Sequence, residues 1–464
     1  MATMGPASGE LKMVRRLVKA GVDVFRINFS HGNDEQRKEF LDNIRKVESE
    51  TGAPIAVMGD LCGPKIRIGP IAGGSILLAE GQQVVVQREP IEGTVERVST
   101  TMAELIDELD VGQVLLLDDG KIRLEVVESR KPDEAVCKTI RGGVLSGGKG
   151  MNLPHAGLSV SALTENDRRN LKWISKRDFD YVAMSFVRSA EDVGQLRRLM
   201  VESGCKAHIV SKIEKPRAVD NIEEIVEASD AVMVARGDLG VEMELPAVPI
   251  AQKRIARLCQ QAGKPCIIAT QMLETMTHSA VPTRAEVSDV ANAVLDHADA
   301  VMLSGETAVG EFPVEAVGMM NRVVQHIQSY HDETYSPVAA QLKPLPTTAA
   351  LAGAVRHVLE AEDIAAVAVF TATGATARML AKCRLPRPII AFSPDIAAVR
   401  RMCLYYGVFA ARADAPKHTR EVLDLAAKFA INAGIASKGE KIVVLTGRPI
   451  GQPGATNTLV VHSI

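Results

Sequence analysis

The segment "HIVSKIEKPRA", residues 208–218, decides the fold because it joins a short apolar run directly to charged residues. The run has the composition of a buried strand. Successive side chains of a strand point to opposite faces, so Lys212 and Glu214 are predicted to point the same way. A buried strand that ends with two charges on one face raises the question of what those charges meet.

Six further apolar runs end in polar or glycine-rich residues in the same way. Segments with helical spacing separate them, and one of these begins with Ser189 and Asp192 at the spacing of a helix N-cap. Strands that alternate with helices predict parallel pairing, and these strands are apolar on both faces. The runs are "VFRINFSHG" from Val24, "IAVMGDL" from Ile55, "YVAMSF" from Tyr181, "AVMVARGDLG" from Ala231, "CIIATQM" from Cys266 and "AVMLSGETA" from Ala300.

The resulting seven strands are one short of the eight that close a (β/α)8 barrel, or TIM barrel. The first ten residues, "MATMGPASGE", read as the end of a strand followed by a turn, so we expect an α/β fold whose first barrel strand is truncated. A barrel that lacks a strand exposes two unpaired strand edges. We therefore expect either a misassigned or truncated chain start, or N-terminal residues that pair incompletely.

The spacing of the strands divides the chain into domains. Between residues 61 and 181 the interval is far longer than the others, and it contains alternating, turn-rich stretches typical of a small antiparallel β domain. We expect this insertion in one βα loop to form a small β-barrel that is placed to act as a lid. After a proline-containing connector, a new alternation predicts a three-layer α/β domain. The expected segments are residues 1–61 and 159–337 for the barrel, 62–158 for the β lid and 338–464 for the C-terminal domain.

Composition and charge exclude several classes of partner. The 464 residues carry a formal net charge of −3, and no dense run of Lys or Arg is present to grip nucleic acid. No apolar stretch reaches the roughly 20 residues that span a bilayer. The 7 cysteines lack CxxC pairs, which suits reduced thiols. We expect a soluble, cytoplasmic protein that binds neither nucleic acid nor membranes.

Polar residues gather at the carboxyl ends of the predicted strands, where the βα loops of a barrel converge. Glu214 and Asp238, on neighbouring strands, are suited as oxygen ligands of Mg2+, which usually takes one or two carboxylates. Cations suited to phosphate and carboxylate groups are Arg26, Lys212 and Arg67. The remaining polar residues of these strand ends are Asn28, Ser30, Arg236, Thr270 and Gln271.

Each of these features also has a purely structural interpretation. A Lys–Glu pair at a strand end is more often an ion pair, and the Arg-Gly-Asp-Leu-Gly turn can be a turn whose Asp caps a helix. His31 is either a general acid or, more often, a loop histidine bonded to backbone. The loop "TATGAT", residues 371–376, offers amides and hydroxyls to a phosphate or simply caps a helix. The convergence of several strand ends favours a functional site.

Seven ordered motifs resemble those of the pyruvate kinase family. They are "FRINFSHG", "GPKIR", "GMNLP", "SKIE", "VARGDLGVE", "IATQMLETM" and "MLSGETAVG", and the ending "GQPGATNTLVV" extends the match over nearly the whole chain. The resemblance implies a barrel with an inserted lid and a C-terminal domain. It also implies transfer of the phosphoryl group of phosphoenolpyruvate to ADP, giving pyruvate and ATP in glycolysis, with Mg2+ or Mn2+ as the metal.

The resemblance assigns a role to each matching residue. Lys212 corresponds to the lysine that neutralises the phosphoryl group in flight and the enolate left behind, and Thr270 to a threonine near the carbon that is protonated. Glu214 and Asp238 correspond to the divalent-metal ligands, and Arg26 to a catalytic arginine that contacts phosphate. Substrate-binding positions are Arg26, Lys212, Ala235, Arg236, Gly237, Asp238 and Thr270, and nucleotide-binding positions are Thr3, Asn28, His31, Arg67 and Lys149.

The chain departs from the family pattern at the monovalent-cation position. Many members hold K+ with residues that match Asn28, Ser30 and Asp60, and with a threonine that is Leu61 in this chain. Potassium-dependent members carry a glutamate where this chain has Lys65. A lysine ammonium that reaches the cleft can supply the missing positive charge, so we expect activity without K+.

The resemblance also implies regulation and assembly. The loop residues Thr371, Thr373, Gly374, Ala375 and Thr376 match the phosphate loop of an effector-binding domain, which implies a phosphorylated allosteric effector. The family usually forms homotetramers. From the residues alone, two other functions stay open: a metal-dependent carbon–carbon lyase that acts through a pyruvate enolate, and a non-catalytic metabolite-binding protein. A lyase would not need the lid or the C-terminal domain.

Overall fold

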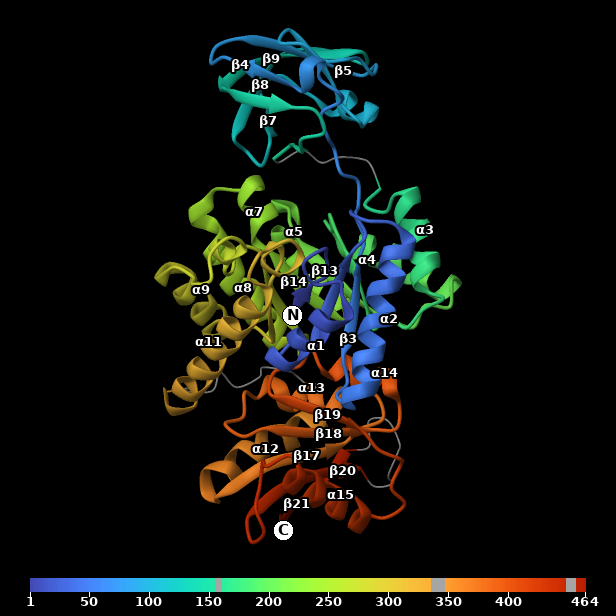
Figure 1. Ribbon diagram of the computed structural model, residues 1–464, viewed down its shortest axis with the longest axis vertical. Helices are drawn as coiled ribbons and strands as arrows, with labels where there is room; N and C mark the ends of the chain where they lie inside the picture. The colour runs from blue at the N-terminus through green and yellow to red at the C-terminus, as the bar shows by residue number, and fades with distance from the viewer. Residues whose placement is uncertain (155–160, 335–346, 448–455) are drawn as a thin grey trace.

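The computed structural model describes residues 1–154, 161–334, 347–447 and 456–464. Three bodies are stacked along the long axis: a β domain at the top, a barrel in the middle and an α/β domain at the bottom (Figure 1). The predicted domain boundaries at residues 158 and 337 lie outside the described residues. Among the described residues, no helix combines the length and the apolar character that crossing a bilayer requires.

The central sheet has 8 strands, and all of its paired neighbours run parallel. The predicted α/β barrel is therefore confirmed. In sheet order the strands are β1 (Ala2–Thr3), β2 (Val24–Asn28), β3 (Ala56–Asp60), β12 (Tyr181–Met184), β13 (His208–Ile213), β14 (Ala231–Ala235), β15 (Cys266–Ala269) and β16 (Ala300–Met302).

The first strand is short, but it pairs on both sides. Ala2 and Thr3 pair with β2, and Ala2 also forms a parallel bridge with Leu303. The amide of Thr3 donates to the carbonyl of Leu303 at 3.1 Å, and the amide of Met4 donates to the backbone carbonyl of Arg26 at 2.8 Å. The two strand edges are therefore partly paired, as the alternative of incomplete N-terminal pairing expects: the 2 residues of β1 bond both neighbours, although β2 is 5 residues long.

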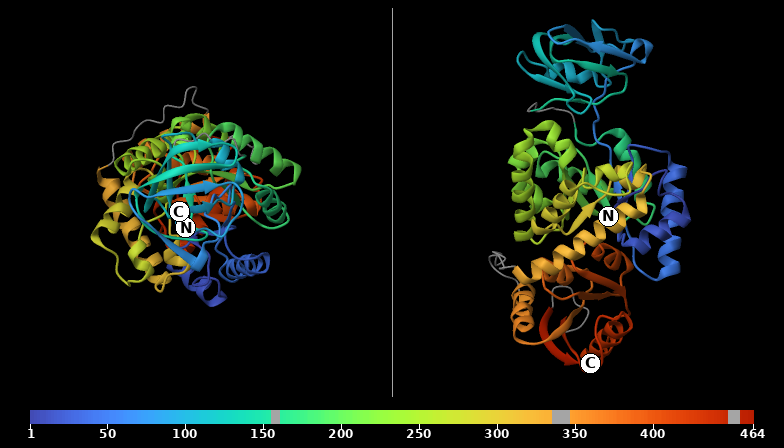
Figure 2. Two further views of the ribbon diagram at one scale, coloured as in Figure 1. Left: turned by 90° about the horizontal axis from the view of Figure 1, so that it is seen from above. Right: turned by 60° about the vertical axis from the view of Figure 1, so that its left-hand side comes forward.

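Helices surround the barrel, as the ribbon seen from above makes clear (Figure 2). Helices α3, α4 and α9 begin with capping boxes, in which a Ser or Thr side chain and an acidic side chain satisfy each other's free amides. The helices of the barrel are α1 (Leu11–Ala20), α2 (Asp34–Thr51), α3 (Glu165–Ile174), α4 (Ala190–Glu202), α5 (Pro216–Asp220), α6 (Ile222–Ala228), α7 (Arg236–Glu242), α8 (Val248–Gln261), α9 (Arg284–Leu295), α10 (Gly305–Ala308) and α11 (Pro313–Thr334), with the 3-10 turns η3 (Leu245–Ala247) and η4 (Glu274–Thr277).

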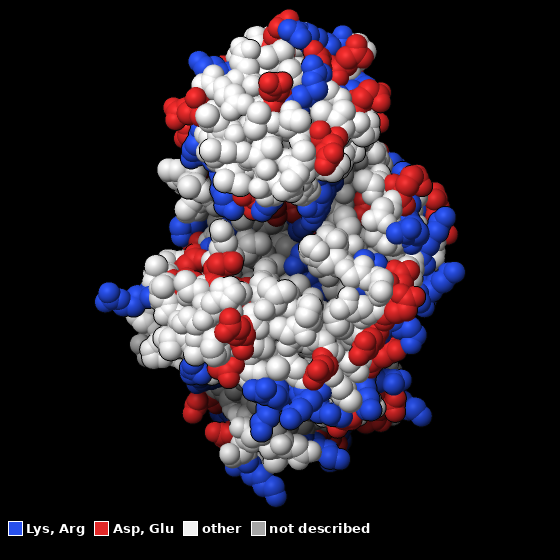
Figure 3. Space-filling model, turned by 45° about the horizontal axis from the view of Figure 1, so that its top comes forward, with Lys and Arg blue, Asp and Glu red and all other residues white. Residues whose placement is uncertain are grey.

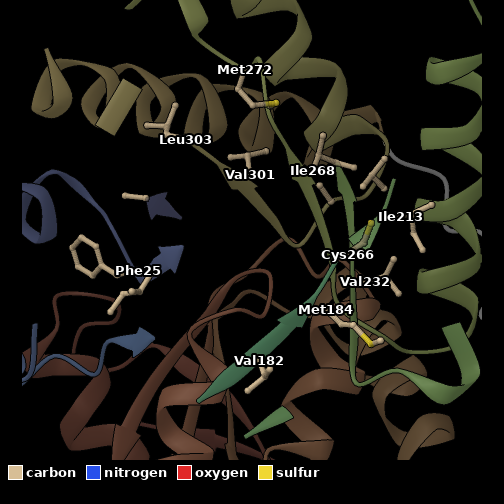
Figure 4. Packing of buried hydrophobic residues seen from close by; sticks show 14 of the residues in the cluster. Phe25, Val182, Met184, Ile213, Val232, Cys266, Ile268, Met272, Val301 and Leu303 are labelled. Carbon is tan, nitrogen blue, oxygen red and sulfur yellow. The ribbon is translucent and has the colours of Figure 1, made fainter. Parts of the chain in front are cut away.

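The barrel strands alternate between two hydrophobic clusters. One set of residues, including Val182 and Ile268, packs against the surrounding helices, and Figure 4 shows part of this cluster. Residues of the opposite parity, including Met58 and Val210, belong to a second cluster that continues into the C-terminal domain. The hydroxyl of Tyr181 donates to the carbonyl of Arg401 at 2.7 Å across the same boundary. The C-terminal domain therefore packs on the end of the barrel opposite to the lid.

The lid has its own hydrophobic cluster and two sheets, with strand orders β10-β4 and β11-β7-β8-β9-β5-β6. A small antiparallel β domain was predicted here, and apart from the parallel pair β5–β6 its strand pairs are antiparallel. Its elements are η1 (Ala72–Gly74), β4 (Ser75–Leu78), β5 (Gln83–Gln87), β6 (Arg97–Ser99), η2 (Ala103–Glu108), β7 (Val114–Leu117), β8 (Ile122–Arg130), β9 (Glu134–Arg141), β10 (Gly143–Ser146) and β11 (Met151–Asn152).

The C-terminal domain is a 5-stranded sheet in the order β19-β18-β17-β20-β21. Only β21 runs antiparallel to its neighbour. The elements are α12 (Thr347–Ala361), β17 (Ile364–Phe370), α13 (Ala375–Lys382), β18 (Ile389–Ser393), α14 (Ile396–Met402), β19 (Val408–Arg412), α15 (Thr419–Asn432), β20 (Lys441–Gly447) and β21 (Thr456–Ser463).

Candidate active site

A buried ammonium lies at the centre of the charged end of the barrel. The Lys212 side chain is 10% exposed, and its Nζ lies 2.7 Å from Glu214 Oε1 and 3.4 Å from Asp60 Oδ2. It also donates to Ser185 Oγ at 2.7 Å. Since Lys212 and Glu214 are two residues apart on β13 and its end, strand alternation brings both to the inside, as predicted.

Asp60, at the end of β3, joins this lysine to a second cation. Arg26 on β2 donates through Nε and Nη2 to Asp60 Oδ2, at 2.8 and 2.5 Å, and through Nη1 to Thr3 Oγ1 at 3.2 Å. The other carboxylate oxygen, Asp60 Oδ1, is buried and has no hydrogen-bond partner among the described residues. An unpartnered buried carboxylate oxygen is suited to accept a cation.

The electrostatic field of the cluster sets its protonation states. Burial alone would lower the pKa of Lys212, but the carboxylates of Asp60 and Glu214 raise that pKa above its ordinary value. Burial raises the pKa of Glu214 and, with the nearby charge of Asp238, outweighs the attraction of Lys212. Lys212 is therefore a permanent cation at neutral pH. Glu214 and Asp238 repel each other, and a cation bound between them would relieve that repulsion.

These two carboxylates fit a divalent metal whose remaining ligands come from water and substrate. Glu214 is buried and Asp238, in the first turn of α7, is exposed. No group of three or more His, Cys, Asp or Glu side chains suited to a metal occurs in the described part of the chain. A substrate that carries phosphate or carboxylate oxygens would have to complete the coordination.

Thr270 occupies a strained backbone conformation next to α7. Its φ is 70°, in the left-handed region that L-residues rarely adopt. Its hydroxyl donates to the Ala269 carbonyl at 2.6 Å and accepts from the Gly237 amide at 2.7 Å. The Arg236 guanidinium donates to the Thr270 carbonyl at 2.8 Å and to Asp289 Oδ1 at 2.6 Å. The Arg236 side chain thus holds the Thr270 turn, while the Ala235–Gly237 backbone begins α7.

The residues matched to nucleotide contacts lie at the barrel end and on the lid. Thr3 is buried at the barrel end, where its hydroxyl donates to Leu303 O at 2.9 Å. Partial burial and the charges of Lys65, Arg67 and Arg26 lower the pKa of His31. The others are Asn28, which accepts from the Ser30 amide at 3.0 Å, Arg67, which donates to Gly148 O at 2.8 Å, and the lid residue Lys149, which pairs with Asp118 at 2.8 Å.

Leu61 and Lys65 lie beside the cluster. Leu61 is buried, and its carbonyl accepts a hydrogen bond from Ser185 Oγ at 2.9 Å. Burial would raise the pKa of Asp60, but the charges of Lys212 and Arg26 lower it below its ordinary value. Lys65 is exposed, and its charge makes a smaller contribution in the same direction. The Lys65 ammonium therefore acts on the same carboxylate that has an unpartnered oxygen.

In the C-terminal domain, the loop of residues 371–376 leads into α13. Thr371 and Thr376 are buried, and Thr373 and Ala375 are exposed. The Gly374 amide, with φ at 86°, donates to Thr371 Oγ1 at 3.1 Å. Thr376 Oγ1 shares a hydrogen bond of 2.8 Å with Thr456 Oγ1. The hydroxyls of Thr371 and Thr376 thus bond within the protein, whereas the Thr373 side chain is exposed.

A cleft of about 1570 Å³ separates the lid from the barrel. Figure 3 shows basic side chains beneath the lid at the mouth of this hollow. From the barrel, Gly237, Asp238 and Thr270 line the cleft. Lid residues that line it include Gln113, Lys121, Arg123 and Arg141.

Three residues of the site were missed in the sequence. Ser185 continues the alternation of Tyr181 and Ala183, so its inward direction could have been predicted from β12. Asp289 on α9 and Glu242 on α7 carry no such signal, because their contacts depend on how two helices approach the strand ends.

Comparisons with known proteins agree with this geometry. The family model described as "Pyruvate kinase, barrel domain" matches residues 1–317, and "Pyruvate kinase, alpha/beta domain" matches residues 349–462. A pyruvate kinase of Methylorubrum extorquens is 42% identical over 98% of this chain and 95% of its own length, and one of Geobacillus stearothermophilus is 40% identical over 100% and 80%. The crystal structure of a pyruvate kinase from Cryptosporidium parvum superposes with a TM-score of 0.92 and 32% identity, covering 100% of this chain and 95% of the other. The predicted resemblance is confirmed: the chain belongs to the pyruvate kinase family and is a phosphotransferase.

Proposed function

We propose that this chain transfers the phosphoryl group of phosphoenolpyruvate to ADP, giving pyruvate and ATP. The convergence of Lys212, Arg26 and two carboxylates at one end of the barrel carries the proposal. Phosphoryl transfer depends mainly on positioning and on neutralising charge, and the buried, paired cations Lys212 and Arg26 would supply both. Membership in the family supports these substrates.

The reaction balances with one proton. A β-phosphate oxygen of ADP forms a bond to the phosphorus, the bond from phosphorus to the enol oxygen breaks, and the bonding electrons stay on the enolate. The methylene carbon then takes up one proton to give pyruvate. Lys212 stays protonated, so it stabilises negative charge on the phosphoryl group and the enolate rather than acting as a base.

Glu214 and Asp238 would hold the divalent cation, Mg2+ or Mn2+, whose charge would neutralise phosphate oxygens. Arg26, already fixed by Asp60, would contact the phosphate. The amides of Ala235, Arg236 and Gly237 would receive the substrate carboxylate, which would replace the Thr270 hydroxyl as the acceptor of the Gly237 amide. The Thr270 hydroxyl would lie near the methylene carbon and orient the water that supplies the proton, and the strained φ of Thr270 keeps that hydroxyl at the end of β15.

A coupled lactate dehydrogenase assay with phosphoenolpyruvate and ADP tests the proposal. The wild-type chain should oxidise NADH only when both substrates are present. Lys212→Ala should lose turnover, by roughly a hundredfold or more if it removes one fixed charge from the transition state, while still binding Mn2+. Turnover by the variant at the wild-type rate would refute the role of Lys212.

We also propose that the enzyme works without K+. The support is Lys65, whose charge acts on Asp60 next to Asn28 and Ser30, and the replacement of the family threonine by Leu61. In tetramethylammonium buffer, added KCl should leave the rate unchanged, and Lys65→Glu should make the rate depend on KCl. Strong stimulation of the wild-type enzyme by KCl would contradict the proposal.

The C-terminal loop and the assembly complete the proposal. We expect the loop around Thr373 and Ala375 to bind the phosphate of an effector. Calorimetric titration with sugar phosphates and AMP should give saturable binding that Thr373→Ala weakens.

We also expect the chain to form a homotetramer in the cytoplasm. Sedimentation of the full chain measures its assembly, and a monomer under assay conditions would exclude the tetramer.

A further inference from the structure

A buried carboxylate, Glu242, connects the lid to the barrel. Glu242 is the last residue of α7, and its side chain is 1% exposed. A buried carboxylate is unfavourable unless it is paired. Its Oε1 accepts hydrogen bonds from Asn152 Nδ2 at 2.6 Å and from the Lys215 ammonium. Its Oε2 is buried and has no partner among the described residues, so Oε1 alone bonds both groups.

The partners of Glu242 come from the two segments that matter most for the site. Asn152 ends β11, which pairs with β7 at the side of the lid that returns to the barrel. Lys215 directly follows Glu214, and its ammonium lies 5.4 Å from the centre of the Phe186 ring. The amide of Phe186 in turn donates to Glu214 Oε2 at 2.9 Å. One end of the network is therefore the lid, and the other is a carboxylate proposed to bind metal.

Glu242 is also linked to the second proposed metal ligand. Asp238 lies four residues earlier on α7, about one helical turn away, so both side chains lie on the same side of the helix. Both residues line the cleft, and Val114 and Leu116 of β7 line it from the lid. Since Leu116 pairs with Asn152, the Asn152–Glu242 hydrogen bond joins the two walls of the cleft.

We propose that Glu242 is a positioning residue that fixes the distance between the lid and the strand ends, with Asn152 as its lid partner and Lys215 as its barrel partner. The proposal rests on the proposed function only for the metal role of Glu214 and Asp238. A shift of β11 away from the barrel would leave a buried amide unpaired and a buried carboxylate less well paired. The network therefore resists changes in cleft width while it holds the loop after Glu214.

The alternative is a simple ion pair between Lys215 and Glu242 that does not involve the lid. Exchanging the amide and the carboxylate between positions 152 and 242 distinguishes this alternative from the proposal. Glu242→Gln places two donors, Asn152 and Lys215, against an amide. Asn152→Asp places a second carboxylate against the first. The double variant N152D/E242Q restores one amide and one carboxylate with their positions exchanged. Arg88→Ala is the matched control, because Arg88 bonds to Pro132 and Asp107 within the lid and not to the barrel.

Two measurements on the full chain decide between the cases. Each single variant should lower kcat/KM for ADP by roughly tenfold or more and raise the Mg2+ concentration for half-maximal rate, and the exchanged pair should recover to within about threefold of wild type. Amide exchange in β7, followed by mass spectrometry without substrates, should speed up in both single variants and slow again in the double variant. Arg88→Ala should change neither quantity.

The proposal would be overturned if the losses of kcat/KM in the two single variants simply multiplied in the double variant. It would also be overturned if amide exchange in β7 stayed at the wild-type rate in both single variants. If either single variant failed to fold, the other single variant and the double variant would still supply the exchange comparison. A wild-type chain without transferase activity would refute the proposed function instead, and the amide exchange would still test the Glu242 network.

Discussion

Replacing Asp180 by Asn should stabilise the protein at neutral pH and leave its stability unchanged in acid. Asp180 precedes β12 at the barrel end that faces the C-terminal domain, and its side chain is 3% exposed. Its Oδ2 accepts from the Val57 amide at 2.8 Å and from Arg45 Nη2 at 3.0 Å. Burial nevertheless raises the pKa of Asp180 from 3.8 to about 6, because these contacts do not replace the lost hydration.

The size of the effect follows from this pKa. A carboxyl group with a raised folded-state pKa favours the folded state while it is protonated, and this advantage is lost as the pH rises from 3.8 to about 6. The difference of about 2.2 pKa units corresponds to about 3 kcal/mol, at 1.36 kcal/mol per unit. An Asn has nearly the shape of the protonated Asp, so Asp180→Asn avoids this loss.

The assay is thermal unfolding of both proteins between pH 4 and pH 8. An unfolding entropy of about 2.1 cal/mol/K per residue gives roughly 1 kcal/mol/K for a chain of this length, so the variant should melt about 3 °C higher at pH 7.5. Near pH 4 the two midpoints should approach each other. A variant that melts lower than wild type at pH 7.5 would refute the reasoning, since the Arg45 contact would then outweigh the burial of the charge.

Three further changes test other parts of the structure. Asp299→Asn should lower the free energy of unfolding by about 3 to 5 kcal/mol, because Asp299 is 1% exposed and pairs at 2.5 Å with the buried Lys382 of the C-terminal domain; urea unfolding measures this, and an unchanged midpoint would contradict it. Ser185→Ala should lower kcat by roughly tenfold, since Lys212 loses one buried hydrogen bond of 2.7 Å worth about 1 to 3 kcal/mol, and full activity in the coupled assay would exclude that effect. Removal of divalent cations with EDTA should abolish turnover and leave the circular dichroism unchanged, because Glu214 stays paired with Lys212; loss of helical signal would show that the metal is needed for folding.

Most of the site was predictable because side chains alternate between the two faces of a strand. Lys212 and Glu214 share a face because they are two residues apart, and the same rule brings Arg26 and Asp60 to the inside from β2 and β3. Residues outside the strands were less predictable. The contacts of Asp289 and Glu242 depend on helix packing, which no local pattern encodes, and the closure of the barrel by Ala2 depends on hydrogen bonds to both neighbouring strands.

The inward face of the strands also explains why the charged site lies at one end only. Along β12 and β13, the inward residues change from Tyr181 and Val210 near the C-terminal domain to Ser185, Lys212 and Glu214 near the lid. The apolar end can continue into the hydrophobic cluster of the C-terminal domain, since it has no charges to solvate. The opposite end cannot be covered by an apolar surface, because burying these charges further would be unfavourable without paired groups. A polar substrate that brings its own charges is the partner that such a strand end can accept.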